Sequence, residues 1–534
     1  MIELAMRFKE TSHFYIWAGV VSACVVWAYA RRKDGYSGLW PLICLNFLLF
    51  LAWGALSNFS HDDTAFLHFA WLISKGLVPF RDFWEHHSPL LPVIVAPLMK
   101  AAPHSPAIFD IARIVSGFIF IANMILGWRI ATQVWQAKAR LSVYLLFVSA
   151  AAIIGQYLIL RADIFMTFFL LAGISVCLDL PRRSPAAWAV CGMAFGLAMS
   201  FITKQYLLVF LPVIAVFLGP RQGRFIRSIA YALGFCAGIV PLAAYLVSAG
   251  TVDEFFLWVF GFNARQMKMC ANFPLIYLGA GIGGGVVLAR QYRASNEARY
   301  ALLLCAVFLS ALSSLTTTSD QDSLLYYHGL WYFLCATAVC GAGLWERISD
   351  SRPRWKNAVI AGCVLGVLLA PNVVSIWKHR AGDYARDRKA AAELMRYTGS
   401  DTCVVLLPAH PVLAHDATRL YSSWQFLFFA RHADVRNDAA VPGFARQILA
   451  RRPAVISAEF GTRDLFLELY HRRVISADEY KDLMAFLKTD YRTRRIGSRL
   501  YYIRQDSRFK FLTQQFGKFF MRRIPAERFS RPVV

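Results

Sequence analysis

Charged residues, and acidic ones above all, are scarce in this chain. Only 17% of its 534 residues are charged, with 33 Asp or Glu against 57 Lys or Arg. So few charges could not cover the surface of a water-soluble protein of this length. The eleven cysteines are scattered, mostly within apolar blocks, with no Cys-x-x-Cys pair, which excludes the usual zinc spacings. Basic and aromatic residues are not interleaved as base stacking would require, so we predict no nucleic-acid partner.

Apolar residues instead dominate, at 57% of the chain, with a mean hydropathy of +0.44. They come in blocks of about 17 to 25 residues, the length that crosses about 30 Å of hydrocarbon. The sequence therefore predicts a polytopic all-α membrane protein with about twelve transmembrane helices. The predicted spans are 14–30, 39–57, 106–130, 141–159, 164–180, 186–202, 205–219, 226–249, 272–289, 300–317, 324–345 and 356–377.

The distribution of Lys and Arg among the linkers predicts the orientation. These residues gather in alternate linkers, at 31–33, 129–140, 182–183, 221–227, 290–299 and 347–356. Basic loops stay on the cytoplasmic side, so the other set of linkers lies outside. Both the N-terminus and everything after residue 378 are then extracytoplasmic, which is the periplasm of a bacterial inner-membrane protein. The net charge of +24 fits basic loops near anionic lipid or an anionic substrate.

The first outer linker, residues 58–105, is more than a simple connection. Residues 63–75 suit a helix that ends before Gly76, and 89–101 are apolar but too short to span. Both segments are predicted to be helices in the outer interface. The stretch between them, 79–89, is crowded with polar, ionisable and aromatic side chains.

A soluble pattern begins at about residue 379 and predicts an extracytoplasmic α/β domain with a basic tail, 379–534. Short buried strands are predicted at 403–407, 454–457 and 500–503, with helices at 384–397, 443–451 and 476–488. The domain boundaries predicted from the sequence are thus 1–378 for the transmembrane part and 379–534 for the soluble part.

Four polar clusters fall at the outer ends of predicted spans. They are His61-Asp62-Asp63, Arg161-Ala162-Asp163, Lys204, and the run from Asp320 to His328. Each by itself is more often a solvated helix cap than a site. Because all four fall on the same face of the membrane, together they indicate a functional site.

These residues carry a resemblance to a known family. Asp62-Asp63, a helix, Gly76, Pro79-Phe80-Arg81-Asp82-Phe83 and His86-His87-Ser88-Pro89 resemble the first outer loop of GT-C fold glycosyltransferases. The most similar group is the bacterial enzymes related to protein O-mannosyltransferases and lipid A aminoarabinose transferase, families 39 and 83. Arg161-Ala162-Asp163 is similar to the family's Arg-Pro-Asp motif and Thr203-Lys204 to its Thr-Lys. The chain departs from the family in having Asp-Asp for the commoner Asp-Glu, and Tyr327-His328-Gly329 where the family has Tyr-x-x-Pro.

The resemblance implies transfer of a sugar from a polyprenyl-phosphate donor to a cell-envelope lipid, glycan or protein. Such a reaction needs a base for the acceptor's proton and positive charge or hydrogen-bond donors at the departing phosphate. Asp62 or Asp63 would be the base, with Asp163 helping to position a substrate. The candidates for the phosphate are Lys204, Arg81, Arg161, His86, His87 and His328, and those for substrate binding are Tyr326, Tyr327, Trp84 and Glu85.

Three alternatives stay open at the level of sequence. A divalent metal held by Asp62, Asp63 and the histidines is the less favoured one, because side chains can neutralise a single phosphate; no cofactor is otherwise expected. His86-His87 would equally suit a polar turn packed against Trp84. The rival class of protein is a transporter or flippase of lipid-linked sugars, although no internal repeat is found and the polar groups lie at the interface rather than at mid-membrane.

Overall fold

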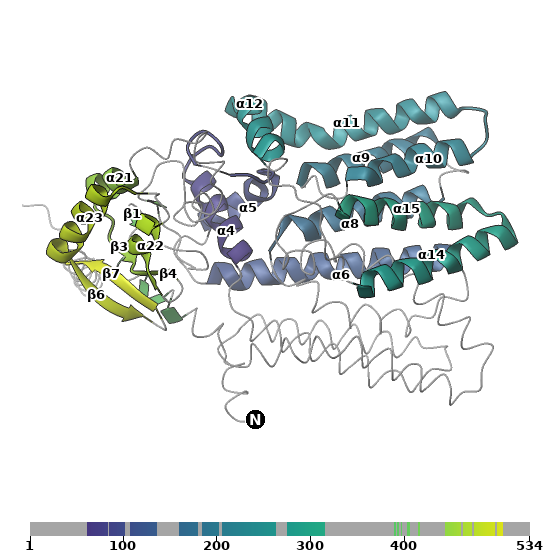
Figure 1. The fold of residues 1–534 in the computed structure, drawn as a ribbon. Helices are drawn as coiled ribbons and strands as arrows, with labels where there is room; N and C mark the ends of the chain where they lie inside the picture. The colour runs from purple at the N-terminus through teal and green to yellow at the C-terminus, as the bar shows by residue number, and fades with distance from the viewer. Residues whose placement is uncertain are drawn as a thin grey trace, which may run out of the picture. The chain divides into compact units, whose positions relative to one another are not determined.

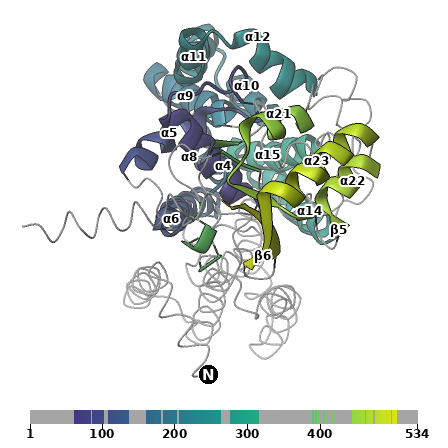
Figure 2. The same cartoon turned by 90° about the vertical axis from the view of Figure 1, so that its left-hand side faces the viewer.

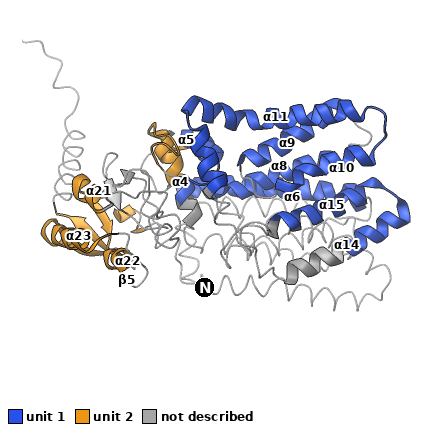
Figure 3. Cartoon of the chain, turned by 45° about the horizontal axis from the view of Figure 1, so that its top comes forward, with its two compact units in different colours: residues 1–66, 85–97, 107–385 blue, residues 67–84, 98–106, 386–534 orange. Residues whose placement is uncertain are grey.

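The structure, a computed structural model, describes residues 61–83, 85–101, 107–135, 160–179, 184–201, 206–262, 275–315, 389–390, 392–394, 397, 403–405, 415–416, 444–460, 463–471, 475–496 and 499–505. The chain divides into two compact units (Figure 3). Unit 1 contains Met1–Phe66, Glu85–Pro97 and Ala107–Ala385, and unit 2 contains Leu67–Trp84, Leu98–Pro106 and Arg386–Val534.

Among the described residues up to Leu315, nearly all are helical (Figure 1). They are α4 (His61–Ser74), α5 (Leu90–Ala101), α6 (Ala107–Trp135), α8 (Ala162–Cys177), α9 (Pro185–Phe201), the 3₁₀ helix η4 (Tyr206–Phe210), α10 (Leu211–Leu218), α11 (Arg224–Ala249), α12 (Val252–Phe255), the π-helix η5 (Phe256–Phe262), α14 (Leu275–Ser295) and α15 (Ala298–Leu315).

Helices therefore lie where seven of the twelve spans are predicted, and the other five spans lie outside the described residues. Within the described part, Asp110–Trp135 and Arg224–Ala249 are long and apolar enough to cross a membrane. The predicted span 205–219 differs from a simple helix. It is a five-residue 3₁₀ helix followed by an eight-residue α-helix, together about 22 Å long.

The two interfacial helices predicted in the first outer linker are confirmed as helices. Helix α4 ends at Ser74, and Gly76 adopts the left-handed φ of +86° that a residue with a Cβ rarely takes. Helix α4 is buried on more than one face, because Trp71 and Leu72 are buried together with Phe66 and Phe69.

Glycines bring α9 and α11 into close contact. A Cβ on Gly192 would lie 2.1 Å from the backbone oxygen of Tyr231, and one on Gly234 would lie 1.9 Å from that of Ala189. Because no side chain separates them there, the two backbones pack directly, as in membrane helix pairs with small residues at the interface. Helices α8 and α6 continue this layer, with Asn123 Nδ2 of α6 donating to the carbonyl of Ile164, 3.1 Å away.

In the C-terminal part of unit 2, five described strands form a mixed sheet in the order β2-β1-β3-β7-β6. The strands are β1 (Cys403–Val405), β2 (His415–Asp416), β3 (Val455–Ser457), β6 (Tyr491–Ile496) and β7 (Arg499–Arg504); β4 (Glu459–Phe460) and β5 (Arg463–Asp464) form a separate pair. Strands β1, β2 and β3 are parallel, and β7 is antiparallel to both neighbours.

The described helices of this sheet domain are α21 (Phe444–Arg451), α22 (Leu465–His471) and α23 (Ala477–Asp490). Helices α21 and α22 contact α23, which packs against β6 (Figure 2). Strands β1, β3 and β7 coincide with the three predicted strands, and α21 and α23 with two of the predicted helices. Ser476 begins α23 with a capping box, in which its hydroxyl accepts from Glu479 N and the Glu479 carboxylate accepts from Ser476 N.

Candidate functional site

Two polar segments, separated by more than seventy residues in sequence, lie at one end of the α8–α9 helix pair. Helix α8 begins at Ala162 and α9 ends at Phe201, and the rings of Phe165 and Phe201 stack with centroids 5.3 Å apart. The hydroxyl of Ser88 donates to the backbone oxygen of Ser200 in the last turn of α9. The segment Glu85–Ser88 is therefore fixed at the same end of the bundle as Arg161 and Asp163.

Glu85 organises the first of these segments. Its carboxylate is 1% exposed, and Oε1 accepts hydrogen bonds from the backbone N–H groups of His86 and His87, both at 2.8 Å. The Nδ1 atom of His87 lies 2.8 Å from the same oxygen. The two imidazole rings lie against one another, with centroids 3.8 Å apart, and the ring of Phe66 contacts His87. The polar residues predicted from the sequence to gather in this segment are, in the structure, one buried carboxylate and two neighbouring imidazoles.

The second segment is a buried ion pair. Arg161 Nη2 lies 2.9 Å from Asp163 Oδ2, and both side chains are 3% exposed. Asp163 is in the first turn of α8, where the helix dipole favours a negative charge, and its backbone oxygen accepts from Thr167 Oγ1. Two of the predicted site residues are therefore each other's partners.

In unit 2, Arg81 lies in a tight turn between two buried phenylalanines. Phe80 has a left-handed φ of +69°, and its N–H donates to the Phe83 carbonyl. The Asp82 carboxylate accepts from the backbone N–H of Val78, 2.8 Å away, and pairs with Arg81 at 2.9 Å. Asp82 therefore stabilises the turn, while the Arg81 side chain stays 57% exposed.

The remaining predicted site residues fall outside what the structure describes. Asp62 and Asp63 belong to the first turn of α4, but their side chains are not described. Trp84, Lys204, Tyr326, Tyr327 and His328 lie outside the described ranges.

The structure also buries polar residues that the sequence did not indicate as candidates for the site. Ser88 anchors the segment Glu85–Ser88 to α9, and Asp110 and Arg113, near the start of α6, are 4% and 1% exposed. A signal for the last two exists in the sequence, because a charged pair three residues apart is unusual at the beginning of an apolar span.

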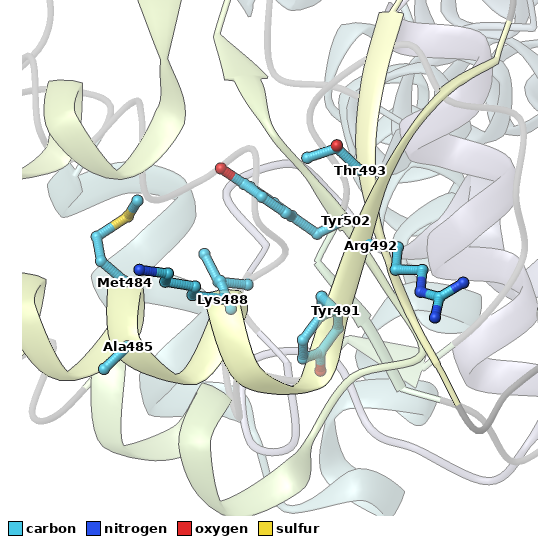
Figure 4. A pocket seen from close by; sticks show the side chains of 8 residues that line it. Met484, Ala485, Lys488, Tyr491, Arg492, Thr493 and Tyr502 are labelled. Atoms are coloured by element: carbon cyan, nitrogen blue, oxygen red, sulfur yellow. The ribbon is translucent and has the colours of Figure 1, made fainter.

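A separate open groove of about 600 Å³ lies in the sheet domain, between α23 and the β6–β7 hairpin. Figure 4 shows Met484 and Lys488 of α23 on one side and Tyr502 of β7 on the other. Burial, together with the nearby Asp464 carboxylate, raises the pKa of Tyr502 to about 12. None of the predicted site residues lines this groove.

The described chain is thus a predominantly helical protein with two helices able to cross a membrane and an ionisable cluster at one end of its helix bundle. No protein-family model matches the sequence, and no match is found among curated proteins.

Solved structures similar to this chain include the oligosaccharyltransferase of Archaeoglobus fulgidus tethered to an acceptor peptide, at 10% identity, TM-score 0.47, covering 88% of this chain and 74% of that one. The oligosaccharyltransferase AglB of the same organism, with an inhibitory peptide and a dolichol-phosphate, matches at 9% identity and TM-score 0.47, covering 89% and 75%. A complex of that organism's oligosaccharyltransferase with Zn and sulfate matches at 10% identity and TM-score 0.45, covering 87% and 73%. At these identities and TM-scores the similarity defines neither the family nor the activity of this chain.

Proposed function

We propose that this chain is an integral-membrane glycosyltransferase of GT-C type, acting at the outer face of a bacterial inner membrane. It moves a sugar from a polyprenyl-phosphate donor to a cell-envelope lipid, glycan or protein. The observation that carries the proposal is the gathering of Glu85, His86 and His87 with Arg161 and Asp163 at one end of the α8–α9 pair. Ionisable groups buried together at the end of apolar helices are typical of a site rather than of solvated caps.

The proposed reaction exchanges one bond at the anomeric carbon of the sugar. The bond from that carbon to the phosphate oxygen breaks, and the polyprenyl phosphate leaves with the electron pair. An acceptor oxygen or nitrogen forms the new bond, and its proton passes to a carboxylate base, which contributes about 10²–10⁴-fold to the rate. Asp62 is the proposed base, with Asp63 as the alternative, because both open the outer loop where the bilayer ends.

Positive charge must meet the departing phosphate. Lys204, Arg81, Arg161, His86, His87 and His328 are the proposed phosphate ligands, and Tyr326, Tyr327, Trp84 and Glu85 are the proposed substrate contacts. Since Asp163 already holds Arg161 at 2.9 Å, we assign Asp163 to positioning that guanidinium. Arg81 is the accessible cation of the outer turn, at 57% exposure.

We further propose that residues 1–378 form the transferase part and 379–534 an extracytoplasmic domain. The sheet domain suits a role in receiving an acceptor rather than in bond making, because none of the proposed reacting groups belongs to it.

The decisive experiment measures polyprenyl phosphate released from lipid-linked sugars of bacterial membranes by the full-length protein in detergent. We expect Asp62→Asn to abolish release while the protein stays folded, because Asn keeps the shape and hydrogen bonds but cannot accept a proton. If Asp62 is only a helix cap, Asp62→Asn should keep normal release and nearly normal stability, because Asn caps a helix about as well as Asp. Only a variant without a capping side chain, such as Asp62→Ala, should then lose about 0.5–2 kcal/mol of stability. Asp478→Asn, on an exposed turn of α23, is the matched control.

The outcomes separate the alternatives. If only Asp63→Asn loses release, the base is Asp63 and not Asp62. Normal release by Asp62→Asn, Asp63→Asn and Asp163→Asn together would refute the mechanism. Movement of intact donor across the membrane without release would favour a flippase.

A further inference from the structure

The groove between α23 and the β6–β7 hairpin contains none of the proposed reacting groups, yet it has the features of a binding site. Its volume of about 600 Å³ lies within the roughly 300–1,000 Å³ of small-molecule sites. Met484 and the ring of Tyr502 supply apolar surface, while Lys488 and Thr493 supply polar groups. Met484 and Lys488 come from the helix and Tyr502 from the hairpin (Figure 4). One aromatic ring, one hydroxyl and one ammonium group are thus available to a single ligand.

Regular secondary structure places these side chains together. Thr493 and Tyr502 are directly paired across the antiparallel strands β6 and β7, so their side chains lie on the same face of the sheet. Met484 and Lys488 are four residues apart on α23 and therefore share one face of that helix. The buried Tyr491 donates its hydroxyl hydrogen to the Pro453 carbonyl and fixes the start of β6. The walls of the groove are therefore parts of the packed domain.

The Tyr502 ring is half-buried and held in place at its hydroxyl. That hydroxyl lies 3.5 Å from Asp464 Oδ2, and Asp464 Oδ1 accepts from the backbone N–H of Leu467 at the beginning of α22. The pKa of Tyr502, raised to about 12 by burial and Asp464, keeps the phenol neutral at physiological pH. A fixed, neutral tyrosine ring offers a large contact area at a low cost in conformational entropy.

The charge around the groove is strongly positive. The hairpin, residues 491–504, has five arginines and no acidic residue. Arg494 is paired with Glu393 at 2.8 Å, whereas Arg492 and, on the helix, Lys488 are exposed. The Arg492 guanidinium points away from Lys488 (Figure 4), so Lys488 is the cation inside the groove. A concave surface with this surplus of positive charge attracts anions.

We propose that this groove binds an acidic glycan, a short chain of sugars that carry carboxylate groups. The apolar C–H face of a sugar ring packs on Tyr502, a sugar hydroxyl bonds to Thr493, and a carboxylate pairs with Lys488. The inference goes beyond the proposed transfer reaction and does not depend on it, because binding here makes and breaks no covalent bond.

Other occupants suit the groove less well. The chain's own residues 506–534 carry seven basic residues against two acidic ones, so a basic groove repels them. A lipid chain needs an enclosed apolar cavity, and this groove is open. An acidic peptide would pair with Lys488 and add to β6, the edge strand among the described ones, without needing the Tyr502 ring. Dependence on that ring therefore distinguishes a glycan from a peptide.

The test titrates the full-length protein in detergent with trigalacturonate, an acidic trisaccharide, by isothermal calorimetry. Maltotriose, a neutral trisaccharide, and hexaglutamate, an acidic peptide, are the matched ligands. We expect trigalacturonate to bind more tightly than either, and its binding to weaken several-fold as salt rises from about 0.05 M to about 0.5 M. Saturation-transfer NMR should show magnetisation passing from aromatic protons of the protein to ring protons of the sugar.

Variants of the groove assign the contacts. Tyr502→Leu should weaken trigalacturonate binding about tenfold, and Tyr502→Phe, which keeps the ring, less than about threefold. Lys488→Gln should weaken it about tenfold, because a charge-assisted bond is lost. Arg446→Gln, at an exposed arginine of α21 that does not line the groove, is the matched control and should bind as the parent does.

Three results would overturn the proposal: no binding of trigalacturonate by the parent, equal binding of hexaglutamate, or unchanged affinity in Tyr502→Leu. Equal affinity for maltotriose would refute the requirement for an acidic group. Circular dichroism and size-exclusion behaviour verify folding. If Tyr502→Leu does not fold, Lys488→Gln and Thr493→Val, both at exposed positions, take its place, and unchanged affinity in both would likewise overturn the proposal. Sugar transfer is measured separately, so failure of the proposed reaction leaves this test valid.

Discussion

Arg161 and Asp163 form a buried ion pair across the first turn of α8, with Nη2 2.9 Å from Oδ2 and 3% exposure of either side chain. Two charges in such a place are costly to desolvate, and their pairing offsets part of that cost. Replacing one partner should therefore lower the free energy of unfolding much more than replacing both partners with apolar residues.

The first prediction concerns the stability that this pair confers. Asp163→Asn should lower the free energy of unfolding by about 3–5 kcal/mol, because it removes the carboxylate that pairs with the buried Arg161 guanidinium. The double variant Arg161→Met, Asp163→Leu should recover most of the loss. Thermal unfolding in detergent measures both. Asp490→Asn, which breaks the exposed Arg452–Asp490 pair, is the control and should cost about 0–1 kcal/mol. Equal losses of stability in Asp163→Asn and Asp490→Asn would contradict the buried ion pair.

The second prediction concerns Lys204. If its ammonium meets the donor phosphate, Lys204→Ala should weaken polyprenyl phosphate binding roughly 10- to 100-fold. Lys204→Arg should retain part of the affinity, since charge matters more than shape for a single phosphate. Binding is measured with polyprenyl phosphate in detergent micelles, with Lys481→Ala on the exposed face of α23 as the control. Unchanged affinity in Lys204→Ala would remove this residue from the site.

The third prediction is topological. Reporter fusions at Arg183, Arg224 and Arg352 should report the cytoplasm, and fusions at Gly250 or after Gly399 the outside, because basic loops remain inside. A cytoplasmic signal after Gly399 would place the sheet domain in the cytoplasm. It would therefore contradict the proposal that the site lies at the outer face of the membrane.

The fourth prediction tests the close contact of α9 and α11. Gly234→Ala should lower the free energy of unfolding by about 1–3 kcal/mol or more, since its Cβ would lie 1.9 Å from the Ala189 carbonyl oxygen. Gly285→Ala is the control, because a Cβ there would lie 3.4 Å from a Leu304 methyl group. It should be neutral or slightly stabilising, as alanine favours helix. Similar melting temperatures for the two variants would refute direct backbone packing.

The fifth prediction concerns alkaline pH. Burial and Asp464 raise the pKa of Tyr502 to about 12, above its usual value near 10, so the fold favours the protonated phenol. The stability contributed by that phenol is therefore complete below about pH 10 and is lost as the pH rises towards 12. Ultraviolet titration of tyrosinate and unfolding at several pH values measure this. Tyr502→Phe should reduce the alkaline loss; a parent and variant with identical pH dependence would contradict it.

Local pattern was sufficient for much of the fold. Apolar runs predicted α6, α8, α9, α10, α11, α14 and α15, Gly76 marked the end of α4, and short β-branched runs predicted β1 and β3; α12 and η5 were not predicted. These features depend on neighbours along the chain, so composition and periodicity report them. Strand β6 was missed, because its three arginines give no apolar alternation. It forms through pairing with β7, with Tyr491 and Ile496 buried at its two ends.

The sequence alone also determined which polar residues occupy the ends of the spans. Tertiary structure decided how they combine. Ser88 and Ser200 are 112 residues apart, and their hydrogen bond brings Glu85 to the end of the bundle where Arg161 and Asp163 lie. Whether a carboxylate is buried, or is paired with an arginine, depends on packing between distant helices. No local pattern records those contacts, because each half of every pair is an ordinary polar residue until the fold brings them together.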